Sequence, residues 1–372
     1  MIWLVSFLPL AIWLHLLFGR GFFWLTRERD DRDAPAPEHW PSVVAVVPAR
    51  NEADVIAHSA GSLLRQDYQG PFRVILVDDQ SDDGTGDVAR TLGGRLDVLS
   101  GAPRPPGWTG KLWAVKQGVV QAGSADYLWL TDADIAHRPN NLSKLVARAE
   151  AGGLVLTSLM AKLHCGNVAE KLLIPAFVFF FDMLYPFGWV NDPRNPLAAA
   201  AGGCMLIRRE ALENAGGIDA IRGEIIDDCA MGRMMKKQGA IWLGLTDRAV
   251  SLRPYRFADI HKMVSRSAYA QLSYSPLQLL GTVIGMLIVY VAAPFVALFA
   301  RGPAQMAGLA AWAIMVIAFA PMLRFYRLSP LWGTLMPLIG ALYGAFTFDS
   351  AVQHWRGRGG MWKGRAQAMG KA

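Results

Sequence analysis

Two aspartates separated by one residue end an apolar run between Tyr127 and Asp134, which reads Tyr-Leu-Trp-Leu-Thr-Asp-Ala-Asp. The run has the character of a β-strand. Because side chains alternate along a strand, Asp132 and Asp134 are expected to leave its carboxyl end on the same side. Carboxylate oxygens are the ligands that Mg²⁺ or Mn²⁺ prefers when it holds a diphosphate. The pattern indicates transfer from a nucleotide-diphosphate donor, although the tripeptide taken alone is more simply the end of a strand.

Two polar segments earlier in the chain also follow strand-like runs. Pro48-Ala-Arg-Asn-Glu52 follows the first run, and Asp78-Asp-Gln-Ser-Asp-Asp-Gly-Thr85 follows the second. Carboxylates at such positions accept hydrogen bonds from a nucleobase N–H or a ribose hydroxyl, and an asparagine can complete the recognition of a base. A turn followed by a helix N-cap explains the second segment more simply, but it leaves several of its acids without a role. The candidate donor-binding residues here are Pro48, Arg50, Asn51, Glu52, Asp78 and Asp79.

A lysine and a pair of acids extend the set. Lys111 follows Pro105-Pro-Gly-Trp-Thr-Gly110 at the opening of a helical pattern, where an ammonium group and helix N-terminal amides can neutralise a diphosphate. Asp227 and Asp228 open a second helical pattern further along. In isolation, Lys111 is better interpreted as a solvated lysine and the two acids as helix caps. Their position in the chain relative to the Asp-Ala-Asp tripeptide favours a functional interpretation of all three residues.

The elements that must position these residues are short β-branched runs alternating with helical segments. We expect strands at Val43–Val47, Arg73–Val77, Leu96–Leu99 and Tyr127–Thr131, which predicts an α/β domain around a largely parallel sheet. Ligands of such sheets bind at the carboxyl ends of the strands, where the candidate residues fall. Neither a Gly-x-Gly-x-x-Gly turn nor a Gly-x-x-x-x-Gly-Lys-Ser/Thr loop is present, which disfavours dinucleotide oxidoreductases and P-loop NTPases.

The two ends of the chain have the composition of membrane segments. Hydrophobic residues make up 53% of the sequence, and its mean hydropathy is +0.24. Ala169–Val190 is apolar but is interrupted by Asp182 and two prolines, so we interpret it as a membrane-surface or substrate-lining helix. The expected spanning segments are a retained N-terminal anchor and three C-terminal helices, at Met1–Leu25, Pro276–Ala300, Ala304–Leu323 and Leu331–Phe348.

The net charge of +7 is concentrated beside these apolar segments. Basic residues follow the first of them at Arg20, Arg27, Arg29 and Arg32, and the last of them at Arg356, Arg358, Lys363, Arg365 and Lys371. This distribution favours an anionic lipid surface over nucleic acid as a partner, and it places the central domain in the cytoplasm. Four spans would then leave the basic tail outside, so either one segment is re-entrant or the count is wrong by one. The three cysteines show neither disulfide nor metal-ligand spacing.

Taken together and in this order, the motifs from Pro48 to Asp134 resemble those of family 2 glycosyltransferases, which are inverting enzymes of the GT-A fold that use nucleotide-sugar donors. The resemblance covers about Ser42 to Ser275. It implies that Asp79 holds a uracil-type base or the ribose, that Asp132 contacts the donor ribose or phosphates, and that Asp134, with Asp132, binds the metal, Mg²⁺ or Mn²⁺.

The resemblance also implies roles further along the chain. Ala201-Gly202-Gly203-Cys204-Met resembles the acceptor-side loop of the family, and Ile226-Asp227-Asp228-Cys resembles its acidic pair, in which the second acid, Asp228, is the general base. Inversion requires such a carboxylate to deprotonate the acceptor hydroxyl. The Gln-x-x-Arg-Trp string of processive members is missing, which favours a single transfer. Arg266 remains a candidate contact of the diphosphate.

Within the family, the membrane segments and the Trp-Arg-Gly-Arg tail look most like the hopene-associated glycosyltransferases of hopanoid biosynthesis. This implies a multi-pass enzyme of the bacterial inner membrane that glycosylates a membrane lipid hydroxyl. A polyisoprenyl phosphate acceptor and a non-catalytic nucleotide-sugar or lipid-binding scaffold are the alternatives. The expected organisation is an anchor (1–26), a linker (27–41), a GT-A domain (42–275), a transmembrane region (276–349) and a basic juxtamembrane tail (350–372).

Overall fold

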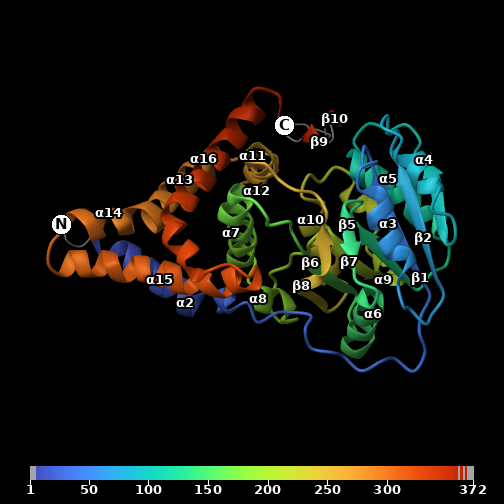
Figure 1. The fold of residues 1–372 in the computed structure, drawn as a ribbon, viewed down its shortest axis with the longest axis horizontal. Helices are drawn as coiled ribbons and strands as arrows, with labels where there is room; N and C mark the ends of the chain where they lie inside the picture. Colours follow the sequence, from blue (N-terminus) through green and yellow to red (C-terminus); the bar gives the residue numbers. More distant parts are fainter. Residues whose placement is uncertain (1–5, 359–360, 363–364, 367–372) are drawn as a thin grey trace. The chain divides into compact units, whose positions relative to one another are not determined.

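The computed structural model describes residues 6–358, 361–362 and 365–366. Its contacts divide the chain into two compact units that are interleaved along the sequence (Figure 1). Unit 1 consists of Met1–Arg27, Cys165–Gly188 and Pro254–Gly360, and unit 2 of Glu28–His164, Trp189–Arg253 and Met361–Ala372. The boundaries at residues 42 and 275, between which the sequence predicts one continuous domain, stay a prediction.

Unit 2 is built on a mixed sheet, with the described strands in the order β3-β2-β1-β4-β7-β6-β8-β5. Parallel pairs join β1 to β2, β1 to β4, β2 to β3 and β6 to β8, whereas β7 is antiparallel to β4 and β6, and β5 to β8. The strands are β1 (Val43–Ala49), β2 (Phe72–Asp78), β3 (Leu96–Ser100), β4 (Tyr127–Thr131), β5 (Ile135–His137), β6 (Leu156–Lys162), β7 (Cys204–Arg208) and β8 (Ile241–Ser251). The expected α/β class and its first four strands are confirmed.

The sheet forms because its central strands are nearly continuous apolar runs. Every residue of β1 and of β4 is buried, as expected for strands that are covered on both faces. Trp129 and Tyr127 of β4 are among the largest fully buried side chains. The helical elements of this unit are α3 (Ile56–Leu64), α4 (Thr85–Arg90), α5 (Gly110–Gln121), α6 (Asn141–Gly152), α9 (Arg209–Asn214), η2 (Ile218–Ile221) and α10 (Asp227–Lys236).

The segment between the N-terminal helix and β1 is fixed to unit 2 over part of its length. Asp30 N–H donates to the Leu245 carbonyl at 3.1 Å, and Leu245 N–H donates to the Glu28 carbonyl at 2.9 Å, so the segment joins β8 through a short parallel bridge. Asp30 is buried and accepts from Thr246 Oγ1 at 2.6 Å. Residues 28–30 are therefore part of the folded unit.

Unit 1 is helical among its described residues. At its N-terminal side lie α2 (Leu8–Gly19) and η1 (Phe23–Leu25). Its other elements are α7 (Val168–Leu184), α11 (Phe257–Ser265), α12 (Ala268–Gln271), α13 (Pro276–Met286), η3 (Leu287–Val291), α14 (Ala292–Phe299), α15 (Pro303–Phe325), η4 (Pro330–Leu335) and α16 (Met336–Trp355), while α8 (Phe187–Asn191) crosses the boundary between the units.

Three helices are long and apolar enough to cross a membrane among the residues described: Pro276–Phe299, Pro303–Phe325 and Pro330–Trp355. The three C-terminal segments expected from the sequence are recovered as helices. The N-terminal helix is shorter than expected, because α2 has 12 residues and ends at Gly19, where Arg20 leaves the helical conformation. At 1.5 Å per residue it is about 18 Å long, short of a hydrocarbon core of about 30 Å. Met1–Val5 lie outside the described residues.

Contacts within unit 1 fix how α15 and α16 run. Helix α15 packs closely on α14 at Gly308, where a methyl group would lie 2.5 Å from the Ala297 nitrogen. Halfway along α15, Trp312 Nε1 donates to the Thr334 carbonyl of η4 at 3.1 Å. Helix α16 begins at this level and runs antiparallel to α13 and η3, since Gly340 packs on Tyr290 and Ala351 clusters with Leu279.

Candidate active site

The candidate residues meet at one edge of the sheet because β1, β2, β4 and β8 all end there. Asp132 and Asp134 follow β4 directly, and the antiparallel β7 begins at the same edge, with Cys204 paired to Thr131. Lys111 lies in the first turn of α5, whose N-cap Thr109 accepts from Leu112 N–H at 3.3 Å. A pocket at this edge is lined by Pro48, Lys111, Asp132, Gly202, Asp227 and apolar neighbours.

Lys111 joins two carboxylates that come from different elements. Its Nζ lies 2.9 Å from Asp132 Oδ1 and 3.0 Å from Asp227 Oδ2. Burial by itself would lower the pKa of Lys111, but the charges of Asp132 and Asp227 outweigh it and raise that pKa above the ordinary lysine value. Burial raises the pKa of Asp132, and Lys111 opposes that shift. The lysine is therefore a fixed positive charge inside the site.

Asp228 is held by the backbone and not by a cation. Its Oδ2 accepts from Gly202 N–H at 3.1 Å and its Oδ1 from Cys229 N–H at 2.7 Å. Burial, followed by the neighbouring charge of Asp227, raises the pKa of Asp228 to about 6. A carboxylate with this pKa is mostly ionised at neutral pH and more basic than an exposed one. It combines the two properties that a general base requires, and it does not serve as an N-cap of α10.

Arg253 forms a second charged group at the same edge, which the sequence analysis missed. Its Nη2 pairs with Glu52 Oε2, and its Nε lies 3.8 Å from Asp134 Oδ2. Ser251 Oγ also donates to Asp134 Oδ2, at 3.3 Å. Ser251 ends β8, which is parallel to β6, and Arg253 follows two residues later. The position of Arg253 just after a long strand was the available signal, because ligands collect at such ends.

The two loops after β1 and β2 are bound to each other. Arg50 Nη1 donates to the Asp79 carbonyl at 2.5 Å and lies 4.0 Å from Asp79 Oδ2, and the Asp79 side chain is fully buried. Asn51 has a φ of 52° and accepts from Asp82 N–H through its side chain at 3.1 Å. Asp78 Oδ1 accepts from Ser81 N–H at 3.0 Å. The loops are pre-formed, and donor recognition by Asp78 and Asp79 stays a prediction.

The glycine loop before β7 lies against the acidic cluster. A methyl group on Gly202 would sit 3.2 Å from Lys111 Nζ and 3.4 Å from Asp228 Cβ. The Gly203 carbonyl accepts from Thr131 Oγ1 at 2.9 Å, and Cys204 is buried. The structure thus brings Gly202 to Asp228, whereas the acceptor role of the loop stays a prediction.

Arg266 belongs to a different unit from the rest of the candidate set. It is the C-cap of α11 in unit 1, whereas the other candidates all lie in unit 2. Its proposed contact with the donor diphosphate therefore stays a prediction.

A divalent metal is implied by the resemblance, and the donor set fits one. Asp132 and Asp134 both present hard oxygen ligands, and Asp134 is close enough that its charge raises the pKa of Asp132. Within residues 6–358, no group of three His, Cys, Asp or Glu side chains is arranged to hold an ion. Mg²⁺ often takes only one or two carboxylates and completes its shell with substrate phosphates and water. Two carboxylates are enough for such a site.

Comparison with known proteins agrees with this geometry. Residues 44–216 match the family model of Glycosyl transferase family 2. A curated 4,4'-diaponeurosporenoate glycosyltransferase of Staphylococcus aureus (strain bovine RF122 / ET3-1) is 32% identical over 204 residues, which are 53% of this chain and 52% of that protein. An N-acetylglucosaminyltransferase of Mesorhizobium japonicum is 27% identical over 194 residues, which are 48% of this chain and 42% of that protein. The matches thus span about half the length of these relatives.

One solved structure resembles almost the whole chain. The mannosyltransferase PcManGT from Pyrobaculum calidifontis, in complex with GDP-Man and Mn²⁺, has a TM-score of 0.60 and 20% sequence identity. The similarity covers 95% of this chain and 99% of that one. It establishes the shared fold.

Proposed function

Because residues 44–216 match the family model of Glycosyl transferase family 2, we propose that the protein is an inverting, metal-dependent glycosyltransferase of that family. It moves a single sugar from a nucleotide sugar, specifically a UDP-sugar, to a hydroxyl group of a membrane lipid. The observation that carries the proposal is the environment of Asp228, a buried carboxylate oriented by two backbone amides beside the Lys111 network.

Different residues act on the acceptor and on the leaving diphosphate. The acceptor oxygen attacks the anomeric carbon as the bond from that carbon to the diphosphate oxygen breaks, and Asp228 takes the acceptor's proton. The electron pair of the broken bond leaves on the diphosphate, whose added charge the Lys111 ammonium stabilises. A divalent ion held by Asp132 and Asp134 would supply further positive charge to the same diphosphate.

Three features support a lipid acceptor. Unit 1 carries three long apolar helices, and many of their large side chains are exposed in the isolated chain, among them Leu277, Phe295, Phe299 and Leu331. An acceptor dissolved in a bilayer is reached by an enzyme held at its surface. One of the curated relatives carries the name 4,4'-diaponeurosporenoate glycosyltransferase. The hopanoid acceptor is the most specific part of the proposal, and its support is the resemblance of the terminal segments.

We place the protein in the bacterial inner membrane, and the helix contacts in unit 1 support a topology with two crossings and one re-entrant segment. Helix α13, η3 and α14 make the first crossing, and α15 makes the second. Because η4 contacts the middle of α15 at Trp312, the chain after α15 turns back at half depth. Helix α16 then returns to the level at which α13 begins, where Ser350 Oγ donates to the Ser265 carbonyl at 2.5 Å. The basic tail then lies on the cytoplasmic side, with the catalytic domain, as the charge rule requires.

A lipid mass spectrum tests the transfer. Total lipids are compared between cells that lack the protein and cells complemented with the wild type or with Asp228→Asn. A glycolipid that appears only with the wild type is the expected result, and its mass and fragments identify the sugar and the acceptor. Full product from Asp228→Asn would instead favour an acceptor that is already ionised, such as a polyisoprenyl phosphate, because it needs no base.

Reporter fusions test the topology on the full chain. Green fluorescent protein joined after Ala372 should fluoresce, and alkaline phosphatase joined there should be inactive. Alkaline phosphatase inserted at Arg301, between α14 and α15, should be active. An active phosphatase at the C-terminus would show three complete crossings and exclude the re-entrant segment.

A further inference from the structure

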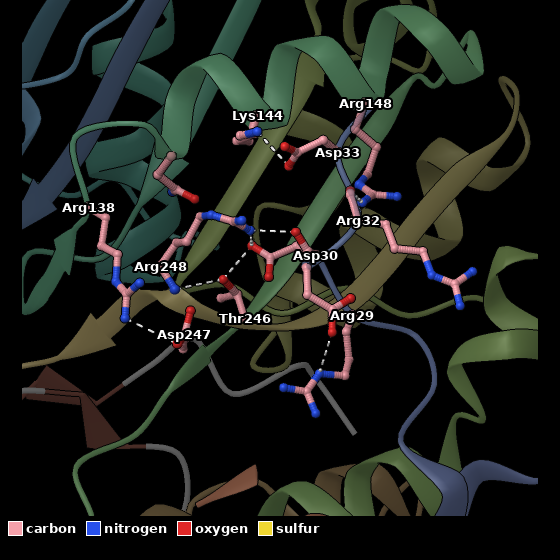
Figure 2. Close-up of polar contacts among 12 residues, drawn as sticks. Arg29, Asp30, Arg32, Asp33, Arg138, Lys144, Arg148, Thr246, Asp247 and Arg248 are labelled. Carbon is pink, nitrogen blue, oxygen red and sulfur yellow. Dashed lines mark hydrogen bonds and ion pairs between the residues drawn. The ribbon is translucent and has the colours of Figure 1, made fainter. Parts of the chain in front are cut away.

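Ten charged residues gather where the N-terminal segment lies on α6 and β8 of unit 2, and we call them the linker cluster (Figure 2). None of them belongs to the candidate active site. Figure 2 labels the cations Arg29, Arg32, Arg138, Lys144, Arg148 and Arg248 and the carboxylates Asp30, Asp33 and Asp247. The tenth member is Asp31, which pairs with Arg29.

Each carboxylate of the cluster is already paired with one cation. Four ion pairs account for them within residues 6–358: Arg248 with Asp30 at 2.9 Å, Arg29 with Asp31 at 3.3 Å, Lys144 with Asp33 at 2.5 Å, and Arg138 with Asp247 at 3.1 Å. Two guanidinium groups remain without a carboxylate partner in the described chain, those of Arg32 and Arg148. Figure 2 labels both, Arg32 on the linker itself and Arg148 next to it.

Arg148 is fixed in place without having its charge neutralised. Its Nη2 donates to the Arg32 carbonyl at 2.8 Å, and its guanidinium lies 4.1 Å from the centre of the Trp242 ring. Burial, only partly offset by neighbouring acids, lowers the pKa of Arg148. The side chain of Arg32 is exposed. One guanidinium is thus pre-organised and the other is free to close on a ligand.

A buried amide next to these arginines also lacks a partner. Asn141 is fully buried. Thr131 Oγ1 donates to the Gly203 carbonyl, so it accepts from His137 Nε2, and His137 Nδ1 is then an acceptor for Asn141 Nδ2 at 3.0 Å. This assignment leaves Asn141 Oδ1 without a hydrogen-bond partner among the described residues.

The unpaired amide and the unpaired guanidinium groups line one pocket. Its walls are formed by Asp30, Arg32, Ala34, Asn141, Lys144, Leu145, Arg148 and Leu159. The one carboxylate among them, Asp30, is paired with Arg248. We propose that this pocket binds the phosphate-containing head group of an anionic membrane lipid. Arg32 and Arg148 take the phosphate oxygens as planar, multidentate donors, and Asn141 Oδ1 accepts from a head-group hydroxyl.

The sequence position of the pocket favours a lipid as the source of the phosphate. Arg32 follows the apolar helix α2 by 13 residues. Basic residues this close to a membrane segment meet the anionic surface of the cytoplasmic leaflet.

Native mass spectrometry of the full chain in detergent tests the site. Phosphatidylglycerol and phosphatidylcholine are titrated separately, and the expected result is one preferentially retained phosphatidylglycerol. Arg32→Ala should weaken that binding roughly tenfold, the effect of losing a charge-assisted contact. Arg29→Ala is the matched control, because it removes an arginine of the same segment whose charge Asp31 already satisfies.

Three results would overturn the proposal. Equal losses in Arg29→Ala and Arg32→Ala would mean general attraction to anionic lipid. Inorganic phosphate that competes as well as the lipid does would identify a free phosphate site. Undiminished binding by both Arg32→Ala and Arg148→Lys would remove both proposed donors. The test does not depend on the transferase proposal, since Asp228→Asn should bind phosphatidylglycerol like the wild type.

Discussion

Unit 2 contains two regions in which charged side chains gather, and their surpluses have opposite sign. At the strand edge, the carboxylates of Glu52, Asp132, Asp134, Asp227 and Asp228 face the cations Lys111 and Arg253. In the linker cluster, six cations face four carboxylates. In both regions, every side chain of the less numerous charge forms an ion pair within the protein: the cations at the strand edge and the carboxylates in the linker cluster.

The difference indicates what each region binds. Charges that remain unpaired after folding are costly when they are desolvated, so they mark the places where a ligand of opposite sign is stabilised. The strand edge retains negative charge, which suits a divalent cation and, at Asp228, a proton. The linker cluster retains positive charge at Arg32 and Arg148, which suits a phosphate. One domain can thus bind a donor and a membrane without the two sites competing.

Replacing Asp228, the proposed base, should have the largest effect at the strand edge. Asp228→Asn retains the shape of the side chain but cannot accept the acceptor's proton, so kcat should fall about 10²- to 10⁴-fold. The Kd for the nucleotide should remain within about threefold, because Asp228 is held by backbone amides and not by the donor. Steady-state kinetics and nucleotide titration of the full-length protein measure both. A kcat that stays near the wild-type value would assign the base elsewhere.

The pH dependence of the wild type should follow the same carboxylate. Burial and Asp227 raise the pKa of Asp228 to about 6. The ionised form is the active one, so the rate should be near its maximum above that pH and fall about tenfold per unit below it. A rate profile between pH 4.5 and 8 measures this. A flat profile down to pH 5 would exclude Asp228 as the titrating base.

Lys111 connects the two halves of the strand edge, so its removal should change both rate and pH profile. Lys111→Gln removes the cation that lowers the pKa values of Asp132 and Asp228. The acid limb of the profile should therefore move to higher pH, and kcat/KM should fall roughly 10- to 100-fold with the loss of a charge beside the diphosphate. Lys116→Gln is the control, because Lys116 lies on the same helix and pairs with Asp219. An unmoved acid limb would separate Lys111 from the base.

Sequence reasoning recovered the strand edge because its residues sit in short loops after periodic strands. Asp132, Lys111 and Asp227 were each weak as single signals, yet they meet within 3.0 Å because parallel strands end together. Arg253 was missed, since pairing it with Glu52 requires knowing that β8 ends at the same edge as β1. Asp79 was predicted to hold the base or ribose, which stays a prediction, and its burial against Arg50 could not be foreseen because it depends on two loops that are distant in sequence.

The linker cluster, in contrast to the strand edge, could not be predicted from the sequence. Composition marks residues 27–41 as a linker, since prolines and charges there give no periodic pattern. Asp30 is nonetheless buried against Thr246 and Arg248, residues more than two hundred positions away. The length of α2 was also misjudged, because hydrophobicity continues past Gly19 whereas the helix does not. Composition indicates whether a segment prefers water or an apolar environment, but tertiary contacts decide which conformation it adopts and which residues it packs against.

The smallest expected effect separates anchoring of the linker from lipid binding. Asp30→Asn leaves the guanidinium of Arg248, which is mostly buried, without its carboxylate, so the free energy of unfolding of unit 2 should fall by about 1–3 kcal/mol. The exposed Asp31→Asn serves as the control, and it should change that free energy by less than about 0.5 kcal/mol. Urea titration followed by tryptophan fluorescence measures both variants. Because Asp30→Asn increases the positive surplus, phosphatidylglycerol should bind the folded variant at least as tightly as the wild type. A parallel loss of stability and lipid binding would mean that the cluster serves only to hold the linker.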